Sequence, residues 1–190
     1  MHAKFLSLFT SHAAPTSSAY TNTTTTTTAS ASATPLPPRG GGSLKSVRVL
    51  WDIENVAVHR DIGALQTVSR LHSFLEARDM YGPNVDCRIT AFFRPYDSRS
   101  DTNHAVPKNV IDDLDRAAVE LVWVSSKRED ADRKLATRIS QEMQVLPAET
   151  TAFVVISSDQ DFRTQYQLLS SSGYHTVVLH TADTQRWQDA

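Results

Sequence analysis

Val47-Arg48-Val49-Leu50-Trp51-Asp52-Ile53-Glu54-Asn55 decides the fold, because this apolar run ends abruptly in two carboxylates and a carboxamide. Runs rich in apolar and β-branched residues are typical of a strand buried on both faces in the middle of a parallel sheet. Asp52 then lies at the carboxyl end of the strand, where open α/β sheets bind their ligands. An Asp after a strand is also common as a helix N-cap or turn residue, so this stretch alone leaves both interpretations open.

A second acidic segment favours the ligand-binding interpretation. The apolar run Phe153-Val154-Val155-Ile156 is followed by Ser157-Ser158-Asp159-Gln160-Asp161-Phe162. Two strands of one sheet that both end in carboxylates indicate a shared site rather than two unrelated turns.

Apolar runs and amphipathic segments alternate between these two stretches and beyond them. The pattern predicts strands at 47–52, 85–93, 120–124, 153–156 and 175–180, and helices at 62–80, 107–117, 129–145, 162–171 and after Asp183. Such alternation is typical of a parallel sheet covered on both faces. We therefore expect an α/β fold, a doubly wound, Rossmann-like five-stranded sheet in which the predicted strands have the order 3-2-1-4-5.

The first 46 residues differ from the rest of the 190-residue chain. They are rich in Ser, Thr, Ala and Pro and contain no Asp or Glu. A segment with so little apolar surface cannot offset the entropy lost on ordering. We expect 1–46 to be a disordered leader and linker and 47–190 to be one domain. Mitochondrial targeting is the lesser alternative, because Lys4, Arg39 and Lys45 are few for a transit peptide.

Charge and composition exclude several classes of protein. Residues 47–190 carry 16 basic and 21 acidic residues, a formal charge of −5, which is the wrong sign for gripping nucleic acid through bulk electrostatics. The excess acid can instead belong to a metal site. No apolar run reaches the roughly 18 residues that span a bilayer, so we expect no membrane association. The single cysteine, Cys87, weakly favours a reducing, intracellular compartment.

The expected strand order brings the acidic segments together. Asp52 and Asp159 would face each other across the crevice, and the helix beginning at Glu129-Asp130-Ala131-Asp132 would add a third carboxylate. Several carboxylates cannot all ionise in one crevice at ordinary cost unless a cation neutralises them. Hard oxygen ligands suit Mg²⁺ or Mn²⁺, and such ions promote phosphoester hydrolysis.

Three segments together resemble the NYN domain, a branch of the PIN-like ribonuclease superfamily. They are Trp51-Asp52-Ile53-Glu54-Asn55, Asp132 with Leu135, and Ser157-Ser158-Asp159-Gln160-Asp161-Phe162. The resemblance covers about 47–182 and is closest to the limkain type, found in meiosis regulator and mRNA stability factor proteins. It implies a metal-dependent endoribonuclease that acts in RNA processing, mRNA decay or regulation of gene expression.

The resemblance also implies roles for individual residues. Asp52, Asp132, Asp159 and Asp161 would bind one or two divalent ions, and Asn55 would orient Asp52 or a water. Asp132 is preferred to Asp130 because the family pattern has a Leu three residues after the acid. Two departures stand out: a Ser at position 158, where many members have Gly, and one extra residue in 127–132. The second departure leaves the choice between Asp130 and Asp132 open.

The same residues have plainer interpretations. Asp130 can be a helix-start acid, and Asp161 can be an N-cap. Glu54 can bond a backbone amide or join the metal site. Trp51 and Trp123 lie within predicted strands, where core packing is the default. Five basic residues could form a rim that contacts RNA phosphates, or could be ordinary solvated charges: Arg94, Lys127, Arg128, Arg133 and Lys134.

The alternative function is a catalytically degenerate NYN module that binds RNA or protein as a scaffold. A nucleotide phosphatase is a more distant alternative, and a dinucleotide dehydrogenase is disfavoured because no Gly-x-Gly-x-x-Gly follows Leu50. The expected partner is single-stranded RNA, and a protein partner or a second copy of the chain is also considered. The resemblance implies a cytoplasmic location, with peroxisomes or RNA granules as alternatives.

Overall fold

The computed structural model describes residues 10–11, 43–94, 105–125, 130–159 and 162–180. The strands are β1 (Thr10–Ser11), β2 (Ser46–Asp52), β3 (Asp86–Phe93), β4 (Glu120–Trp123), β5 (Thr151–Ile156) and β6 (His175–His180). The helices are α2 (Ala64–Glu76), α3 (Lys108–Arg116), α4 (Asp130–Val145), the 3₁₀ helix Ala148–Thr150 and α5 (Arg163–Ser171). The short helix expected after Asp183 lies outside these residues.

One sheet with the order β1-β6-β5-β2-β3-β4 organises the described part of the chain. Strands β2 to β6 are parallel to one another, which confirms the doubly wound order expected from the sequence. β2 pairs with β3 on one side and with β5 on the other. The carboxyl ends of β2 and β5 therefore lie side by side, as the argument for a shared site requires.

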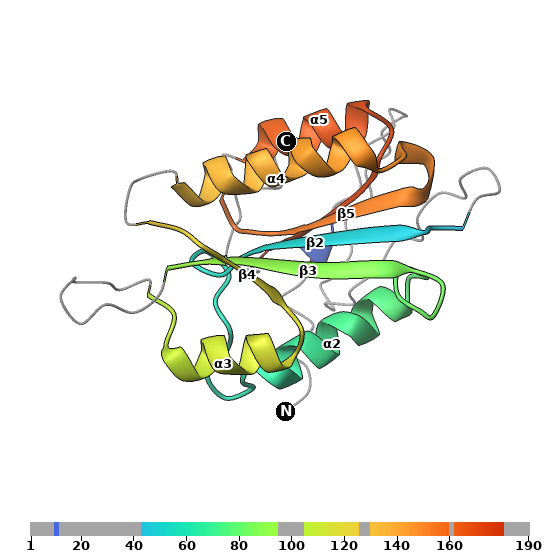
Figure 1. Cartoon of the computed structure of the whole chain (residues 1–190). Coiled ribbons are helices and arrows are strands. Elements are labelled where there is room, and N and C mark those ends of the chain that lie inside the picture. The colour runs from blue at the N-terminus through green and yellow to red at the C-terminus, as the bar shows by residue number, and fades with distance from the viewer. Residues whose placement is uncertain (1–9, 12–42, 95–104, 126–129, 160–161, 181–190) are drawn as a thin grey trace, which may run out of the picture.

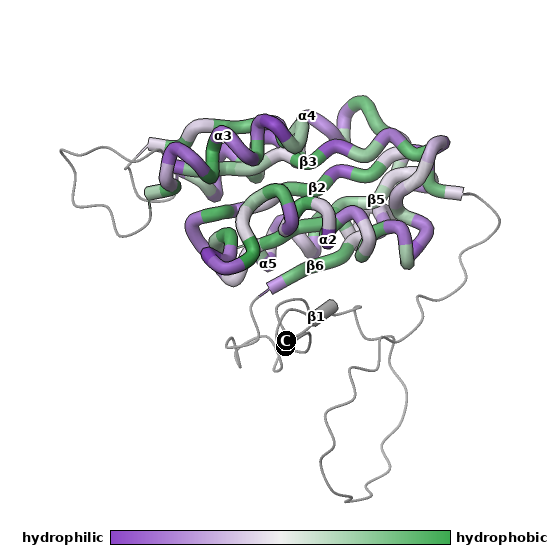
Figure 2. Tube along the Cα trace, turned by 90° about the horizontal axis from the view of Figure 1, so that it is seen from below, coloured by the Kyte–Doolittle hydropathy of each residue, from purple (hydrophilic) through white to green (hydrophobic). Residues whose placement is uncertain are grey.

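Two hydrophobic cores flank the sheet because the side chains of each strand alternate between its faces. α2 and α3 cover one face and α4 and α5 cover the other, as Figure 1 shows. The larger core packs Val49 and Trp51 of β2 against α2, and the second core packs Leu50 against Leu135 of α4. Figure 2 shows long apolar stretches along the strands, whereas the helices alternate between apolar and polar residues.

Two leader residues add a strand that the sequence did not indicate. Thr10 and Ser11 form β1, which pairs antiparallel with the end of β6 at His180 and Leu179. A bare edge strand exposes a row of unpaired backbone groups, and β1 covers part of that row on β6. The pairing depends on the position of β6 at the sheet edge, which the leader sequence itself does not encode.

The expected burial of both strand tryptophans is right for Trp51 and wrong for Trp123. Trp51 is 2% exposed, whereas Trp123 is 67% exposed. The difference follows from strand position, because β2 lies inside the sheet and β4 is its edge strand. An apolar run such as Glu120-Leu121-Val122-Trp123 does not reveal whether neighbouring strands flank it on one side or on both.

Three helices end in the same Schellman arrangement, in which a residue with positive φ follows the last turn. These residues are Asp79 (φ 56°) after α2, Ala118 (φ 57°) after α3 and Gly173 (φ 86°) after α5. After α2, Met80 N–H donates to Leu75 O at 2.9 Å and Asp79 N–H donates to Glu76 O at 3.0 Å. α2 therefore ends at Glu76, four residues before the expected end.

Replacing Ala118 with Gly is expected to stabilise the fold by about 1 kcal/mol, because a non-glycine residue at positive φ is strained. The exposed Ala118 side chain contributes little packing that the substitution would remove. Urea unfolding of the variant would show the shift in midpoint. Ala117→Gly is the matched control: Ala117 has φ −83°, so this variant should gain nothing. A less stable Ala118→Gly variant would contradict the argument.

Candidate active site

Asp52 ends β2 inside the sheet, and its side chain is completely buried. The turn after it folds back onto its carboxylate: Asn55 Nδ2 donates to Asp52 Oδ2 at 2.6 Å, and the Asn55 backbone N–H contacts Oδ1 at 3.4 Å. Val56 N–H donates to the Asp52 carbonyl at 3.0 Å. Asp side chains commonly stabilise turns in this way. The structure thus brings Asp52 and Asn55 together, and their catalytic roles stay predictions.

Ser157 joins the ends of β2 and β5. Trp51 pairs with Ile156, so the next residues along each strand, Asp52 and Ser157, leave the sheet side by side. Ser157 Oγ donates to Asp52 Oδ2 at 3.2 Å and accepts the Asp159 backbone N–H at 3.1 Å. One hydroxyl therefore links the buried carboxylate to the turn that carries Asp159.

Ser157 was not among the residues singled out from the sequence. The available signal was a hydroxyl residue directly after the last apolar residue of β5, in the strand expected beside β2. Its contact with Asp52 depends on the register between the two strands, and a local sequence pattern does not give that register.

Burial raises the pKa of the Asp52 carboxyl above its ordinary value, while hydrogen bonds from Asn55 and Ser157 act in the opposite direction. An ionised carboxylate with a raised pKa costs folding free energy at neutral pH. A cation beside Asp52 would offset that cost. The raised pKa of the buried Asp52 carboxyl is therefore consistent with a cation-binding site.

The acids at the start of α4 occupy different environments. Asp130 is buried, and its Oδ2 accepts Ser125 N–H at 2.7 Å. Its carboxylate also pairs with Arg133 and, at 3.2 Å, with Lys134 Nζ. The Ser125 hydrogen bond, followed by those from Lys134 and Arg133, holds the pKa of Asp130 well below its usual range. These contacts give Asp130 a structural role in fixing the entry to α4.

Asp132 is half-buried, two residues further along the first turn of α4. Its role as the middle acid stays a prediction. Asp159 is also half-buried, and Asp161 lies outside the described residues.

Glu54 and Arg94 form an ion pair at the ends of β2 and β3, with Arg94 Nη2 donating to Glu54 Oε2 at 2.9 Å. Both side chains are mostly buried. The sequence suggested a backbone amide as the partner of Glu54, and the structure shows the Arg94 guanidinium as a partner. Of the expected basic rim, Arg94, Arg133 and Lys134 all have carboxylate partners, and Lys127 and Arg128 lie outside the described residues.

Within the described residues, no group of three or more His, Cys, Asp and Glu side chains is placed to hold a metal ion. Asp52 and Asp159 lie on adjacent strand ends, but the described part of the chain does not complete a three-carboxylate cluster with them. A complete ligand set would need a residue such as Asp161.

Residues 46–188 match the model of the NYN domain family. The chain belongs to the NYN domain family. This assignment agrees with the parallel sheet and with acidic residues at the ends of two neighbouring strands, and it places the NYN domain in the PIN-like superfamily, which has a nuclease-type fold. Nucleases of this superfamily generally use divalent metal ions, and the NYN domain suggests an interaction with RNA.

No curated protein matches this NYN domain sequence. The narrower resemblance to the limkain type therefore stays a prediction. Among the helices that the structure describes, none has the length and apolar character needed to cross a membrane.

Proposed function

We propose that this NYN domain is a divalent-metal-dependent endoribonuclease that hydrolyses phosphodiester bonds in single-stranded RNA. The observation that carries the proposal is the buried Asp52 carboxylate at the end of β2, held by Asn55 and linked through Ser157 to the Asp159 turn. Placing an acid at 0% exposure costs free energy that a purely structural turn would not need. A catalytic or metal-binding role accounts for that cost.

The chemistry of these side chains fits Mg²⁺ or Mn²⁺. The candidate ligands are all carboxylates, the hard oxygen donors that these ions prefer. Asp52 Oδ2 accepts hydrogen bonds from Asn55 Nδ2 at 2.6 Å and Ser157 Oγ at 3.2 Å, whereas the contact of Oδ1 with Asn55 N–H is longer, at 3.4 Å. The backbone of Glu54 also donates to the Asp52 carboxylate. We propose that Oδ1, which has the longer contact, is the oxygen that binds the cation. Asp159, Asp132 and Asp161 are the proposed further ligands.

The chain's own residues would prepare the site for hydrolysis. Asn55 and Ser157 hold the Asp52 carboxylate in one orientation, so no reorganisation is needed when substrate arrives. Ser157 also restrains the backbone at Asp159. When bound, a divalent ion supplies positive charge that stabilises phosphoryl oxygens and makes water a better nucleophile.

RNA processing, mRNA decay and regulation of gene expression are the proposed biological settings, as the limkain resemblance implies. The same resemblance leads us to propose a cytoplasmic location, with peroxisomes or RNA granules as alternatives. Protein partners or a second copy of the chain could supply RNA-binding surface, because the acidic domain provides little through its net charge.

One observation favours the alternative of a non-cutting scaffold. The described residues do not assemble three metal-ligating side chains, as would be expected of a degenerate active site. Against it stands the buried Asp52, which a binding-only domain would not need beside an RNA backbone. The two functions differ in a single outcome, which is whether RNA is cut or only bound.

A panel of Asp→Asn variants tests the proposed ligands. Asp159→Asn and Asp132→Asn are expected to lower RNA cleavage by at least about 100-fold without loss of stability. Asp130→Asn is expected to lose about 1–3 kcal/mol of stability, because charge-assisted bonds to Arg133 and Lys134 disappear. Asp115→Asn, at an exposed position of α3, is the control and should change neither property.

Cleavage would be followed on a labelled single-stranded RNA, and stability by urea unfolding. If Asp130→Asn lost cleavage at full stability while Asp132→Asn kept it, the middle acid would be Asp130. Full activity in the Asp159→Asn variant would contradict the proposed site.

A further inference from the structure

Trp123 is an exposed aromatic residue at the carboxyl end of the parallel strands, the end at which Asp52 also lies. It is the last residue of β4 and is 67% exposed. A side chain with so much apolar surface gains free energy when a ligand covers it. Trp123 has no part in the candidate site described above.

Strand register places Trp123 close to the candidate site. Asp52 pairs with Phe92 of β3, and Phe92 pairs with Val122 of β4, so Trp123 lies two strands away and one residue further along. Because strand side chains alternate between faces, Trp123 projects from the face opposite to that of Asp52, and the two residues share the carboxyl end of the sheet. Neighbouring strands are about 4.8 Å apart, which gives a separation on the order of 10 Å between the Asp52 and Trp123 backbones. A few nucleotides of RNA can bridge that distance.

Cationic groups lie beside and between these two positions. Lys134 Nζ donates to the Trp123 carbonyl, pairs with Asp130 Oδ2 at 3.2 Å and stays 39% exposed. Arg94 follows Phe93, the β3 partner of Trp123, and its guanidinium pairs with Glu54 of the turn after Asp52. Among the described residues, Arg94 Nε is buried without a hydrogen-bond partner. Cationic groups and an indole at the carboxyl end of the sheet are suited to the phosphates and the bases, respectively, of single-stranded RNA.

A nucleobase fits Trp123 better than a protein partner does. Protein interfaces use contiguous apolar patches, whereas the other exposed large hydrophobic residues of the described chain lie on or beside other elements. They are Leu65 on α2, Tyr81 after α2, Val145 on α4 and Leu168 on α5. A lone indole beside cationic groups is the arrangement with which proteins stack single-stranded bases.

We propose that Trp123 is a stacking platform for one base of a single-stranded RNA whose backbone passes Arg94 to reach Asp52. This inference rests on the proposed ribonuclease function and adds a substrate-binding residue to it. The platform positions RNA over the strand ends and takes no part in the chemical step. Base stacking on an aromatic side chain tolerates any sequence, so it predicts little base preference at this position.

RNA binding in EDTA tests the platform without cleavage. A fluorescently labelled single-stranded RNA is expected to bind Trp123→Ala about 5- to 150-fold more weakly than the wild type. Trp123→Phe keeps an aromatic face and should recover most of the affinity. Tyr81→Ala is the matched control: Tyr81 is an exposed aromatic residue between α2 and β3, away from the carboxyl ends of the strands, and should bind RNA as the wild type does. Circular dichroism would confirm that every variant folds.

An oligomer of the same length built from abasic tetrahydrofuran spacers separates stacking from backbone contact. The spacer oligomer keeps the phosphates but has no bases, so wild type and Trp123→Ala should bind it equally. If wild type and Trp123→Ala bound RNA with equal affinity, the platform would be overturned. It would also be overturned if Trp123→Ala lost as much affinity for the spacer oligomer as for RNA.

Cleavage in Mn²⁺, measured beside binding, distinguishes the two proposals. Cleavage by the wild type with no effect of Trp123→Ala on binding would overturn the platform and leave the ribonuclease intact. Binding that depends on Trp123 without any cleavage would support the platform and contradict the nuclease. Failure of the wild-type chain to bind RNA would overturn both.

Discussion

An Asp52→Asn variant is expected to lose RNA cleavage by at least about 100-fold and, at neutral pH, to unfold at a higher temperature than the wild type. Cleavage falls because an amide does not replace a carboxylate as a ligand for a hard cation. Stability rises because burial has raised the pKa of Asp52, so its ionised form costs folding free energy. The two properties should therefore move in opposite directions.

Local geometry allows the substitution. The carbonyl oxygen of an Asn at position 52 can replace Oδ2, which accepts hydrogen bonds from Asn55 Nδ2 and Ser157 Oγ. The new amide group then takes the place of Oδ1, whose contact with Asn55 N–H is long, at 3.4 Å. The variant thus removes a buried charge and keeps the stronger hydrogen bonds.

The difference in stability between Asp52→Asn and the wild type should change with pH in a defined direction. The pKa of Asp52 is higher in the folded protein than its ordinary value of 3.8. Protonated Asp52 therefore stabilises the fold below pH 3.8, and this stabilisation is lost as the pH rises through the pKa of the folded state. The stability advantage of Asp52→Asn should therefore be largest at neutral pH and should shrink in acid. Thermal unfolding in EDTA at several pH values would measure it, with Asp115→Asn as the exposed control. A lower melting temperature at neutral pH, or retained cleavage, would contradict the account.

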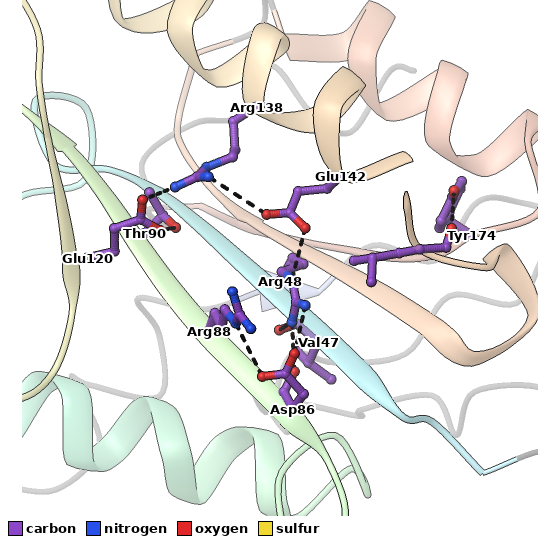
Figure 3. Close-up of polar contacts among 10 residues, drawn as sticks. Val47, Arg48, Asp86, Arg88, Thr90, Glu120, Arg138, Glu142 and Tyr174 are labelled. Carbon is purple, nitrogen blue, oxygen red and sulfur yellow. Dashed lines mark hydrogen bonds and ion pairs between the residues drawn. The ribbon is translucent and has the colours of Figure 1, made fainter. Parts of the chain in front are cut away.

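An Arg48→Met variant is expected to lose about 3–5 kcal/mol of stability. Arg48 is 4% exposed within β2 and donates to Glu142 Oε2 at 3.1 Å, to Asp86 Oδ2 at 2.8 Å and to the Asp86 carbonyl at 2.7 Å (Figure 3). Removing the guanidinium leaves the largely buried Glu142 carboxylate, among the described residues, with the more distant Arg138 guanidinium at 3.9 Å. A buried carboxylate without its close partner accounts for most of the expected loss.

Arg88→Met is the matched control for this prediction. Arg88 also pairs with Asp86, at 3.3 Å, but its side chain is 63% exposed. Exposed ion pairs contribute about 0–1 kcal/mol, so the control should change stability little. Urea unfolding of both variants would provide the comparison. Equal stability of Arg48→Met and the wild type would show that apolar packing at this position replaces the ionic contacts.

The sequence predicted those features of the fold that depend on local pattern. Strand and helix alternation gave the parallel sheet and its order, because apolar runs and amphipathic segments follow directly from residue spacing. His175–His180 forms β6 with the expected bounds. The Asp52–Asn55 contact was also predictable from the sequence, because a turn brings together residues only three positions apart.

Features that depend on distant residues were not predictable in the same way. Arg48 lies in a strand that reads as apolar, and its partners Asp86 and Glu142 are 38 and 94 positions away. Ser157 meets Asp52 only through the register of two strands 105 positions apart in sequence. The exposure of Trp123 follows from the edge position of β4, which is a property of the whole sheet.

Cleavage of an end-labelled single-stranded RNA by the purified wild-type chain, in Mn²⁺ or Mg²⁺ and then in EDTA, tests the central claim most directly. We predict cleavage in the presence of metal, its loss in EDTA and its return when metal is added in excess. Undiminished cleavage in EDTA would contradict the metal-dependent site at Asp52. Intact RNA in every metal, bound by a folded protein, would contradict the nuclease and support the scaffold.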